Sequence, residues 1–370
     1  MKILLAGPLP EPMNGCSYAN AVFRKHCVKS GHFMLIVDTS VPYISGEQGS
    51  RFSWRKALDF VRIYRGLPRV ASADVVYMTP GQTFFGLLKY APFMSFARLL
   101  RKPYVIHVHG NHLGDHYAQL NGIKKWLFHH YVSGADAGIV LSESLRANFD
   151  GLLPMNKVFV VENFAGDALF DQPIATKSSA HLEVLYLSNL MREKGILVLL
   201  DALLLLKEQA VSFHARIAGH METGIAAEVE QRLARLEHEV EYVGPVKGQA
   251  KVDLLRDANA VVLPTYYTME GQPISLLEGM AAGNIIVTTS HAGIPDIVNE
   301  SNGYLLPVRD AQALATCLGK IAADLPAEIA RFCSHNRQTA AERFTEQVFV
   351  GKILAVLDCV ISASPKGAFD

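Results

Sequence analysis

The sequence has few of the features that define membrane-spanning, metal-binding or disulfide-bonded proteins. Its five cysteines, among 370 residues, include no Cys-x-x-Cys pair and have no histidine at metal-ligand spacing, so free thiols in a reducing compartment are expected. No run of about 20 apolar residues could span a bilayer. The formal net charge is zero, which argues against a dedicated nucleic-acid-binding protein. These absences predict a cytoplasmic protein.

Charge is nevertheless distributed unevenly along the chain. Residues 1–165 carry 18 Lys/Arg and 10 Asp/Glu, a balance of 18 − 10 = +8, whereas the remainder carries 17 and 25, a balance of −8. A basic first part is typical of proteins that meet an anionic partner, such as a phosphate-bearing substrate or a membrane surface. A two-domain enzyme with uneven surfaces would show the same balance, and both interpretations stay open.

Short apolar strands alternate with helical patterns along the chain, which is typical of doubly wound α/β sheets. Residues 1–7 fit a first strand and are too short an apolar run for a signal peptide. The first series of predicted strands covers residues 3–6, 34–37, 75–78, 104–108, 138–141 and 158–161. The second series covers residues 184–187, 215–218, 240–243, 260–263, 285–288 and 304–306. The pattern predicts two Rossmann-like domains in tandem.

A polar stretch without clear periodicity, residues 165–180, separates the two series and is predicted to be a linker. We therefore expect an N-terminal domain over residues 1–165, a C-terminal domain over 166–345 and a helix over 346–370 that returns to the N-terminal domain. Ligands of such sheets bind beyond the carboxyl ends of the strands. Two domains that face each other would form one cleft, and the residues that follow each strand are its candidates.

The most informative motif is a pair of glutamates, Glu270 and Glu278. They follow the apolar strand 260–263, so Glu270 is expected in a strand-to-helix loop and Glu278 inside the helix. The helix has almost no polar face, and a carboxylate there costs several kcal/mol unless a group donates to it. Ligand hydroxyls would serve, and so would an Arg or Lys from elsewhere in the fold.

The residues between the two glutamates form a helix start. Pro273 fits the first turn, because its missing N–H would be unpaired there anyway. The amides around Gly271, Gln272 and Ile274 would then face the loop, at the positive end of the helix dipole.

Three further strand ends carry candidate residues. The Gly/Pro loop 7–17 allows a phosphate to approach the backbone, although it is not the G-x-G-x-x-G of dinucleotide sites and an ordinary turn explains it as well. His107 and His109 alternate onto one side of a strand, where they could bind a metal, pack in the core or, for His109, contact a substrate. Arg192 and Lys194 precede a helix N-terminus, where cations favour an anionic ligand such as a diphosphate.

These pieces occur in an order that resembles a known family. The segment 270–283, followed by Ala292-Gly293-Ile294-Pro295 and Asn302-Gly303, resembles the C-terminal domain of retaining GT-B glycosyltransferases, and more narrowly glycosyltransferase family four. The loop 187–195, Ala218-Gly219, Gly244-Pro245-Val246 and, more weakly, Asn14-Gly15 and Val108-His109-Gly110 fall where that family has counterparts. The resemblance implies two Rossmann-like domains facing each other across a cleft.

The resemblance also implies roles for single residues. Glu278 would accept hydrogen bonds from ribose hydroxyls, Lys194 would neutralise the diphosphate, and Glu270 and His109 would lie beside the donor sugar. The residues with implied catalytic roles are His109, Lys194 and Glu270. The implied donor-binding residues are Asn14, Gly15, Asn189, Arg192, Gly219, Val246, Gly271, Gln272, Ile274 and Glu278. No metal and no cofactor are expected, because the family works without a metal and the chain has no Asp-x-Asp.

The chain departs from the family in two places. Asn189 stands where many relatives have arginine, so Arg192 is expected to replace that cation. Gln272 and Pro273 replace the Phe-Gly of a common Gly-Phe-Gly, so an amide is lost and the Gln272 side chain is expected to contribute a donor instead.

The predicted function is transfer of a sugar from a nucleotide diphosphate sugar to a hydroxyl of a glycan or lipid-linked glycan, with retention, in bacterial-type surface polysaccharide synthesis. The alternatives are a nucleotide-sugar epimerase and a non-catalytic nucleotide-sugar-binding protein. Residues 51–65 and 93–102 mix cations with aromatics, as membrane-surface helices do. Amphipathic core helices with a basic outer face would show the same pattern. Peripheral contact with an anionic membrane, at the inner face, is therefore a further hypothesis.

Overall fold

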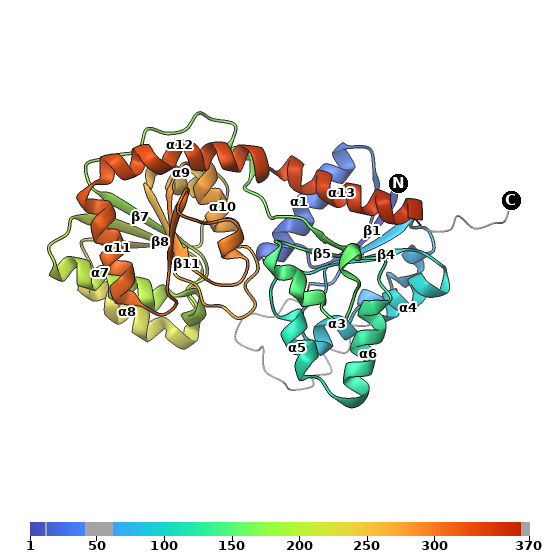
Figure 1. The fold of residues 1–370 in the computed structure, drawn as a ribbon. Helices are drawn as coiled ribbons and strands as arrows, with labels where there is room; N and C mark the ends of the chain where they lie inside the picture. Colours follow the sequence, from blue (N-terminus) through green and yellow to red (C-terminus); the bar gives the residue numbers. More distant parts are fainter. Residues whose placement is uncertain (12, 41–61, 364–370) are drawn as a thin grey trace. The chain divides into compact units, whose positions relative to one another are not determined.

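The computed structural model describes residues 1–11, 13–40 and 62–363, which form two units, each built round a parallel sheet (Figure 1). Unit 1 comprises Met1–Asn163, Met269–Gln272 and Gln347–Asp370, and unit 2 comprises Phe164–Thr268 and Pro273–Glu346. The predicted α/β class with two doubly wound sheets is confirmed. The predicted domain bounds, 165 and 345, fall within two residues of two of these divisions, whereas the short segment 269–272 was not expected in unit 1.

The sheet of unit 1 has the order β2-β1-β3-β4-β5-β6, with every neighbouring pair parallel. Its strands are β1 (Lys2–Gly7), β2 (Phe33–Asp38), β3 (Val75–Met78), β4 (Tyr104–His107), β5 (Ala137–Val140) and β6 (Val158–Val160). The central strands β3, β4 and β5 are buried along their whole length, as parallel strands covered on both faces must be. All six predicted strands of this series are confirmed.

Helices connect these strands on both faces of the sheet. They are α1 (Gly15–Lys29), η1 (Leu67–Val70), α3 (Phe84–Leu88), α4 (Ala91–Leu99), α5 (Leu113–Gln119), α6 (Gly122–Ser133), η2 (Ser144–Phe149) and η3 (Met155–Lys157). The helix α1 begins with a capping box, in which the Ser17 amide donates to Asn14 Oδ1 and the Asn14 amide donates to Ser17 Oγ, both at 2.9 Å.

The last helix of the chain, α13 (Glu346–Ala363), belongs to unit 1 from Gln347 onward. Phe349 on this helix is buried 6.4 Å from His107, ring centroid to ring centroid, and Lys352 donates to Glu162 at 2.8 Å. In Figure 1, α13 runs beside α1 over the first sheet. The predicted return of the C-terminal helix to the N-terminal domain is therefore confirmed.

The sheet of unit 2 has the order β12-β11-β10-β7-β8-β9 and is also parallel throughout. Its strands are β7 (Leu182–Leu187), β8 (Phe213–Ala218), β9 (Val240–Gly244), β10 (Ala260–Leu263), β11 (Ile285–Thr289) and β12 (Gly303–Leu306). The six predicted strands of the second series are confirmed to within two residues. The order reverses between β7 and β10, so the switch point of the sheet lies where the loops after β7 and β10 meet.

Helices again cover both faces of this sheet. They are η4 (Asp167–Leu169), η5 (Arg192–Lys194), α7 (Ile196–Glu208), η6 (Thr223–Ile225), α8 (Ala226–Arg235), α9 (Gly248–Asp257), α10 (Ile274–Ala281), η7 (Ile294–Asp296), α11 (Ala311–Ala323) and α12 (Leu325–Arg343). The helix α7 packs against α8 and α11 on one face, and α10 packs against α12 on the other (Figure 1). The almost wholly apolar α7 is buried along most of its length, which its sequence requires.

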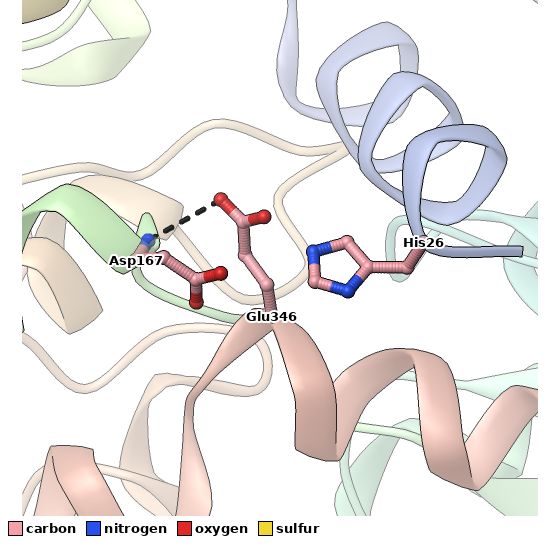
Figure 2. Close-up of side chains that lie close together, drawn as sticks. All are labelled: His26, Asp167 and Glu346. Atoms are coloured by element: carbon pink, nitrogen blue, oxygen red, sulfur yellow. Dashed lines mark hydrogen bonds between the residues drawn. The ribbon is translucent and has the colours of Figure 1, made fainter. Parts of the chain in front are cut away.

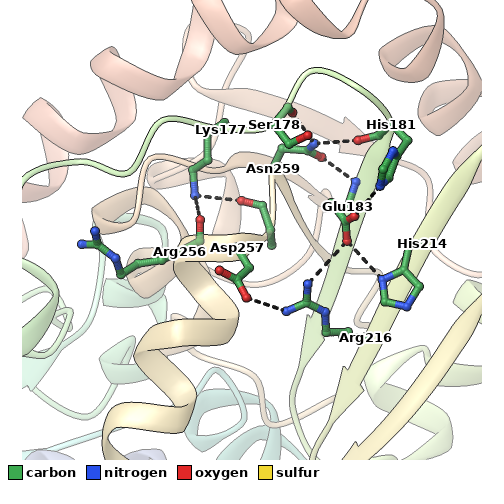
Figure 3. Close-up of polar contacts among 10 residues, drawn as sticks. Lys177, Ser178, His181, Glu183, His214, Arg216, Arg256, Asp257 and Asn259 are labelled. Carbon is green, nitrogen blue, oxygen red and sulfur yellow. Dashed lines mark hydrogen bonds and ion pairs between the residues drawn. The ribbon is translucent and has the colours of Figure 1, made fainter.

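The stretch predicted to be a linker is held against unit 2 by a buried lysine (Figure 3). Lys177 is 8% exposed, and its ammonium lies within 3.2 Å of the carbonyl oxygens of Leu255, Arg256 and Ala258 and 2.8 Å from Asn284 Oδ1. Burial lowers the pKa of Lys177 to about 8. The residues round Lys177 are therefore part of the packed unit, and the prediction that the whole of 165–180 is a linker is wrong.

A second set of contacts fixes the start of β7. Asn259 accepts from the Glu183 amide at 2.9 Å and donates to the carbonyl oxygens of Ser178 and His181 (Figure 3). At the other end of unit 2, Glu346 accepts a hydrogen bond from the Asp167 amide at 3.3 Å (Figure 2). Side-chain contacts to backbone thus fix the start of β7 and join the beginning and the end of unit 2.

The two segments predicted as amphipathic helices have different outcomes. Of residues 51–65, the part 51–61 lies outside the described residues. Of residues 93–102, most form α4, in which Phe93, Met94 and Ala97 are buried in the core, whereas Arg98 and Leu99 at its end are exposed. Within the described ranges, no helix has the length and apolar character needed to cross a bilayer.

Candidate active site

Two glycines of unit 2 bring the loops after β7, β8 and β10 together. Gly195 has φ +79°, and a Cβ there would lie 2.1 Å from the Pro264 carbonyl oxygen. Gly219 has φ +152°, and its Cβ would lie 1.9 Å from the Ser188 carbonyl oxygen. No L side chain fits contacts this short, so the backbone of each loop approaches its neighbour only because these residues are glycine.

Backbone hydrogen bonds hold these loops in place. The Leu190 amide donates to the His220 carbonyl at 2.8 Å, and the Tyr266 amide donates to the Glu193 carbonyl at 2.8 Å. The Tyr186 hydroxyl donates to the Asn189 carbonyl at 3.0 Å. The turn that carries the predicted cations is therefore fixed from both neighbouring strand ends, as a binding site on a rigid scaffold requires.

The predicted phosphate-binding cations have different surroundings in unit 2. Lys194 Nζ lies 5.0 Å from the centre of the Tyr267 ring, in the loop after β10. The exposed Arg192 instead pairs with Glu228 on α8, and this carboxylate raises the pKa of Arg192. Asn189 is exposed on the same turn. The structure therefore supplies Arg192 with a protein partner that the sequence analysis did not predict.

Glu278 also has a partner that the sequence analysis did not identify. It is 3% exposed on α10, and its Oε1 lies 2.5 Å from the ammonium of Lys251 on α9. Burial raises the pKa of the Glu278 carboxyl, and Lys251 beside it acts in the opposite direction. Because the Lys251 side chain keeps 24% of its exposure, this pair lies at the edge of the core, where a ligand could reach it.

The turn after β9 leads into the helix that carries Lys251. Gly244 ends the strand with φ +73°, and the half-buried Val246 follows it. The helix α10 begins at Ile274 with Pro273 in the capping position, so the expected proline at the helix start is confirmed to within one residue.

In unit 1, His107 and His109 lie on the same side of the strand end, as predicted. Their rings stack with centroids 4.1 Å apart, and the Tyr77 hydroxyl lies 2.6 Å from His107 Nδ1. Burial lowers the pKa of His109 to about 4, and burial with the neighbouring His109 holds the pKa of His107 well below its usual range, so both imidazoles are neutral near pH 7. Both Nε2 atoms are buried, and neither has a hydrogen-bond partner among the residues that the structure describes.

These histidines do not resemble a metal site. Among the residues that the structure describes, neither belongs to a group of three side chains that could ligate one ion. The unpartnered Nε2 of His109 is instead a buried polar atom that a ligand hydroxyl would satisfy.

The segment 269–272 lies against the ends of β4 and β5 within unit 1. A Cβ on Gly110 would be 2.5 Å from the Met269 carbonyl oxygen, and a Cβ on Gly271 would be 2.6 Å from the His109 carbonyl oxygen. The backbone of Gly271 therefore lies beside the backbone of His109. Glu270, which precedes Gly271 in the chain, is 6% exposed. The structure thus brings His109, Glu270 and Gly271 together.

The side chain of Gln272 fixes this segment. Its Oε1 accepts from the Asn163 main-chain amide at 2.6 Å, and its Nε2 donates to the Leu141 carbonyl at 3.2 Å. The main-chain carbonyl of Gln272 in addition accepts from Asn163 Nδ2 at 2.7 Å. Gln272 is 3% exposed. The Gln272 side chain, which was predicted to donate a hydrogen bond to the ligand, therefore binds protein groups through both its oxygen and its nitrogen. The sequence did not indicate this anchoring role.

The remaining predicted residues of unit 1 lie at the start of α1. The Asn14 side chain caps this helix, and Gly15 is its first residue. The loop before them is held by the buried Asn20, which donates to the Pro8 carbonyl at 2.9 Å and to Thr79 Oγ1 at 2.8 Å. The capping side chain thus leaves the helix amides, rather than Asn14 Oδ1, as the groups that could meet a ligand.

Comparison with known proteins identifies the segment that holds Lys194, Lys251 and Glu278. Residues 181–324 match the family model described as "Glycosyl transferases group 1". The predicted resemblance to group 1 glycosyltransferases is confirmed over these residues. It covers most of unit 2, including every strand of its sheet.

Individual glycosyltransferases are also similar to part of this chain. The chain is 33% identical over 186 residues to the putative colanic acid biosynthesis glycosyltransferase WcaL of Escherichia coli (strain K12), covering 48% of this chain and 45% of that protein. It is 34% identical over 145 residues to the amylovoran biosynthesis glycosyltransferase AmsK of Erwinia amylovora, covering 37% and 35%. The matches therefore span less than half the length of these curated relatives.

The similarity of fold extends over nearly the whole chain. The crystal structure of Anabaena HepE in complex with UDP matches with a TM-score of 0.73 and 17% identity, and it covers 97% of this chain and 100% of that one. The two-sheet GT-B fold expected from the resemblance is confirmed.

Proposed function

We propose that this protein is a glycosyltransferase that moves a sugar from a nucleotide diphosphate sugar to a hydroxyl group of a glycan or lipid-linked glycan. The bond between the anomeric carbon and the diphosphate breaks, a bond to the acceptor oxygen forms, and the proton of the acceptor hydroxyl passes to the departing diphosphate. The group 1 match over the part of unit 2 that carries Lys194 and Glu278 is the main support. WcaL and AmsK, named for colanic acid and amylovoran synthesis, favour a surface polysaccharide as the product class.

In this proposal the nucleotide binds beyond the carboxyl ends of the strands in unit 2. Lys194, next to the β7 turn, would neutralise the diphosphate as it departs. Glu278 would accept from the ribose hydroxyls and exchange its contact with Lys251 for them. Arg192 would leave Glu228 to contribute a second cation, which is inexpensive because both side chains are about half exposed.

The cluster in unit 1 would bind a sugar. His109 is neutral near pH 7, so its buried Nε2 can share a hydrogen bond with a sugar hydroxyl without placing a charge there. Glu270 and the amide of Gly271 would bind further hydroxyls of the sugar, with Gln272 holding the segment in position. Retention of configuration, metal independence and a hexosyl donor are parts of the proposal.

The test is a turnover measurement on purified variants. Glu278→Ala and Lys194→Ala should each lower nucleotide release on the order of 100-fold or more while leaving the circular dichroism spectrum unchanged. Glu230→Ala and Lys320→Ala, which change an exposed acid and an exposed base of unit 2, should keep wild-type turnover. Near-normal activity of either site variant would refute the assignment.

The assay also separates the transferase from the two alternatives. UDP, GDP and ADP sugars are screened for binding, and free nucleotide is then measured with and without glycan or lipid-linked acceptors. A transferase releases nucleotide in proportion to acceptor, with or without EDTA if no metal is needed. An epimerase would act without acceptor, and a binding protein would release none.

A further inference from the structure

We propose that one exposed face of unit 1 docks on an anionic lipid bilayer. This basic-aromatic face is defined by the following residues of α3, α6 and the end of α4: Phe85, Ile123, Lys124, Trp126, Arg98 and Leu99. It lies apart from the segment 93–97, whose aromatic residues are mostly buried in the core. In Figure 1, α3, α4 and α6 gather on the side of the first sheet opposite α1 and α13.

Large apolar side chains are concentrated on this face. Phe85 is 70% exposed, Ile123 is 67% exposed, Trp126 is 58% exposed and Leu99 is 74% exposed. Single exposed apolar residues are ordinary, but a set of four that includes a tryptophan and a phenylalanine on adjoining helices marks a surface for binding.

Cations stand among these apolar side chains. Ile123 and Trp126 are three residues apart on α6 and share its outer face. Between them, Lys124 Nζ lies 6.0 Å from the centre of the Phe85 ring, which joins α6 to α3. Lys125 Nζ lies 4.9 Å from the Tyr117 ring on α5.

The face continues from α6 to the end of α4. The rings of Trp126 and His130 stack with centroids 5.2 Å apart, and Arg98 donates to His130 Nε2 at 2.9 Å. Leu99 follows Arg98, and the exposed Arg101 comes just after the helix. Because α4 and α6 are in contact, the end of α4 and the outer face of α6 form one continuous surface.

The charge of this part of unit 1 has one sign. Residues 75–135, which include all four of these helices, contain six Lys/Arg and a single acidic residue, Asp115, a balance of 6 − 1 = +5. Most of the +8 of residues 1–165 therefore comes from this region. This excess of cations over carboxylates favours the attraction of an anionic surface.

A bilayer suits this face better than a protein partner does. Tryptophan and phenylalanine partition to the boundary between headgroups and acyl chains, and lysine stems lie along apolar groups while their ammonium groups reach phosphates. The centre of a protein interface, by contrast, is depleted in lysine. Each Lys or Arg near an anionic leaflet strengthens binding about five-fold, so the cations and the apolar tips together provide the two signals that stable adsorption needs.

Only the biological role of this membrane binding rests on the proposed function, because adsorption would bring unit 1 to a lipid-linked acceptor. Its test needs no transfer. Flotation of the full chain is measured with vesicles of phosphatidylcholine alone and of phosphatidylcholine mixed with phosphatidylglycerol, at low and at physiological salt. Binding to the anionic vesicles only, weakened by salt, is expected.

Variants then map the surface. Phe85→Ser with Trp126→Ser should abolish flotation, and Lys124→Gln should weaken it about five-fold. Phe33→Ser and Lys29→Gln are the matched controls, since Phe33 is 61% exposed on β2 and Lys29 is exposed at the end of α1. Both controls should float like the wild type.

Three outcomes would overturn the inference. They are a wild type that ignores anionic vesicles, patch variants that float as well as the controls, and a self-associated form in gel filtration that dissociates in the Phe85/Trp126 variant without any vesicle. Nucleotide release with a water-soluble acceptor should stay at the wild-type level in every variant. Failure of the proposed function would instead remove that activity from the wild type and leave flotation intact.

Discussion

Replacing Lys251 by methionine should destabilise unit 2, because the buried Glu278 carboxylate loses the ammonium group that stabilises it. Methionine keeps the length and the apolar contacts of the lysine stem and removes only the ammonium that stands 2.5 Å from Glu278 Oε1. Glu278, at 3% exposure, then has no partner of opposite charge at that position. The carboxyl must either fold ionised without the ammonium or fold protonated.

The second option sets the size of the effect. Protonating a glutamate with the ordinary pKa of 4.5 at pH 7 costs 1.36 × 2.5, or about 3.4 kcal/mol. Removing one partner of a buried pair by mutation costs about 3–5 kcal/mol when both are fully enclosed. Lys251 retains 24% of its exposure, so the lower end applies, and we expect about 3 kcal/mol for Lys251→Met at pH 7.

The pH dependence has a defined sign. Burial raises the folded-state pKa of Glu278 above its unfolded value, and without Lys251 the rise is larger. A raised carboxyl pKa favours the protonated folded form, so the associated stability is present below the unfolded pKa of 4.5 and is lost as pH rises through the folded pKa. The difference between wild type and Lys251→Met should therefore be small near pH 4.5 and grow toward pH 7.

The assay is scanning calorimetry or urea unfolding followed by circular dichroism, between pH 4.5 and pH 8. The double variant Lys251→Met/Glu278→Gln should recover most of the lost stability, because a neutral amide removes the charge. Lys207→Met, which breaks an ion pair with Glu239 whose partners are 37% and 28% exposed, should cost about 1 kcal/mol or less. A Lys251→Met variant as stable as the wild type at pH 7, or a loss that does not change with pH, would refute the reasoning.

Two further predictions use the same measurement. Gly195→Ala should cost about 2–4 kcal/mol of stability and lower nucleotide binding, because it combines φ +79° with a Cβ 2.1 Å from a carbonyl oxygen. The control Gly248→Ala, with φ +57° and nothing within 4 Å of the added Cβ, should cost only about 1 kcal/mol. Equal losses in the two variants would contradict the role of the close contact. Gln272→Leu should cost about 2–4 kcal/mol by leaving the Asn163 amide and the Leu141 carbonyl without their partner, whereas Leu at the exposed Gln338 should change stability by less than about 0.5 kcal/mol.

Several features of the site could be predicted from local sequence. The position of Pro273 at the start of α10 and of Glu278 within it follows from helix-start chemistry, and the same-side placement of His107 and His109 follows from strand alternation. The two strand series followed from short runs of apolar residues that contain valine and isoleucine. Each of these depends on residues within one or two turns of each other in the chain.

The partners of charged and polar side chains could not be predicted in this way. Glu278 was expected to need a donor, but Lys251 lies 27 residues earlier on a different helix. Gln272 meets Asn163, 109 residues away, and Lys177 meets carbonyl groups about 80 residues away. Only the folded chain brings such groups within hydrogen-bond distance.

The sequence by itself determined the two Rossmann-like sheets, the helix that carries Glu278 and the resemblance to group 1 glycosyltransferases, because periodicity and motif spacing are local properties. The tertiary structure alone decided that Glu278 pairs with Lys251, that Gln272 anchors the segment beside His109, and that Phe85, Trp126 and Lys124 form one exposed face. The physical reason is that hydrogen bonds and ion pairs act over a few ångströms in space, whatever the separation along the chain.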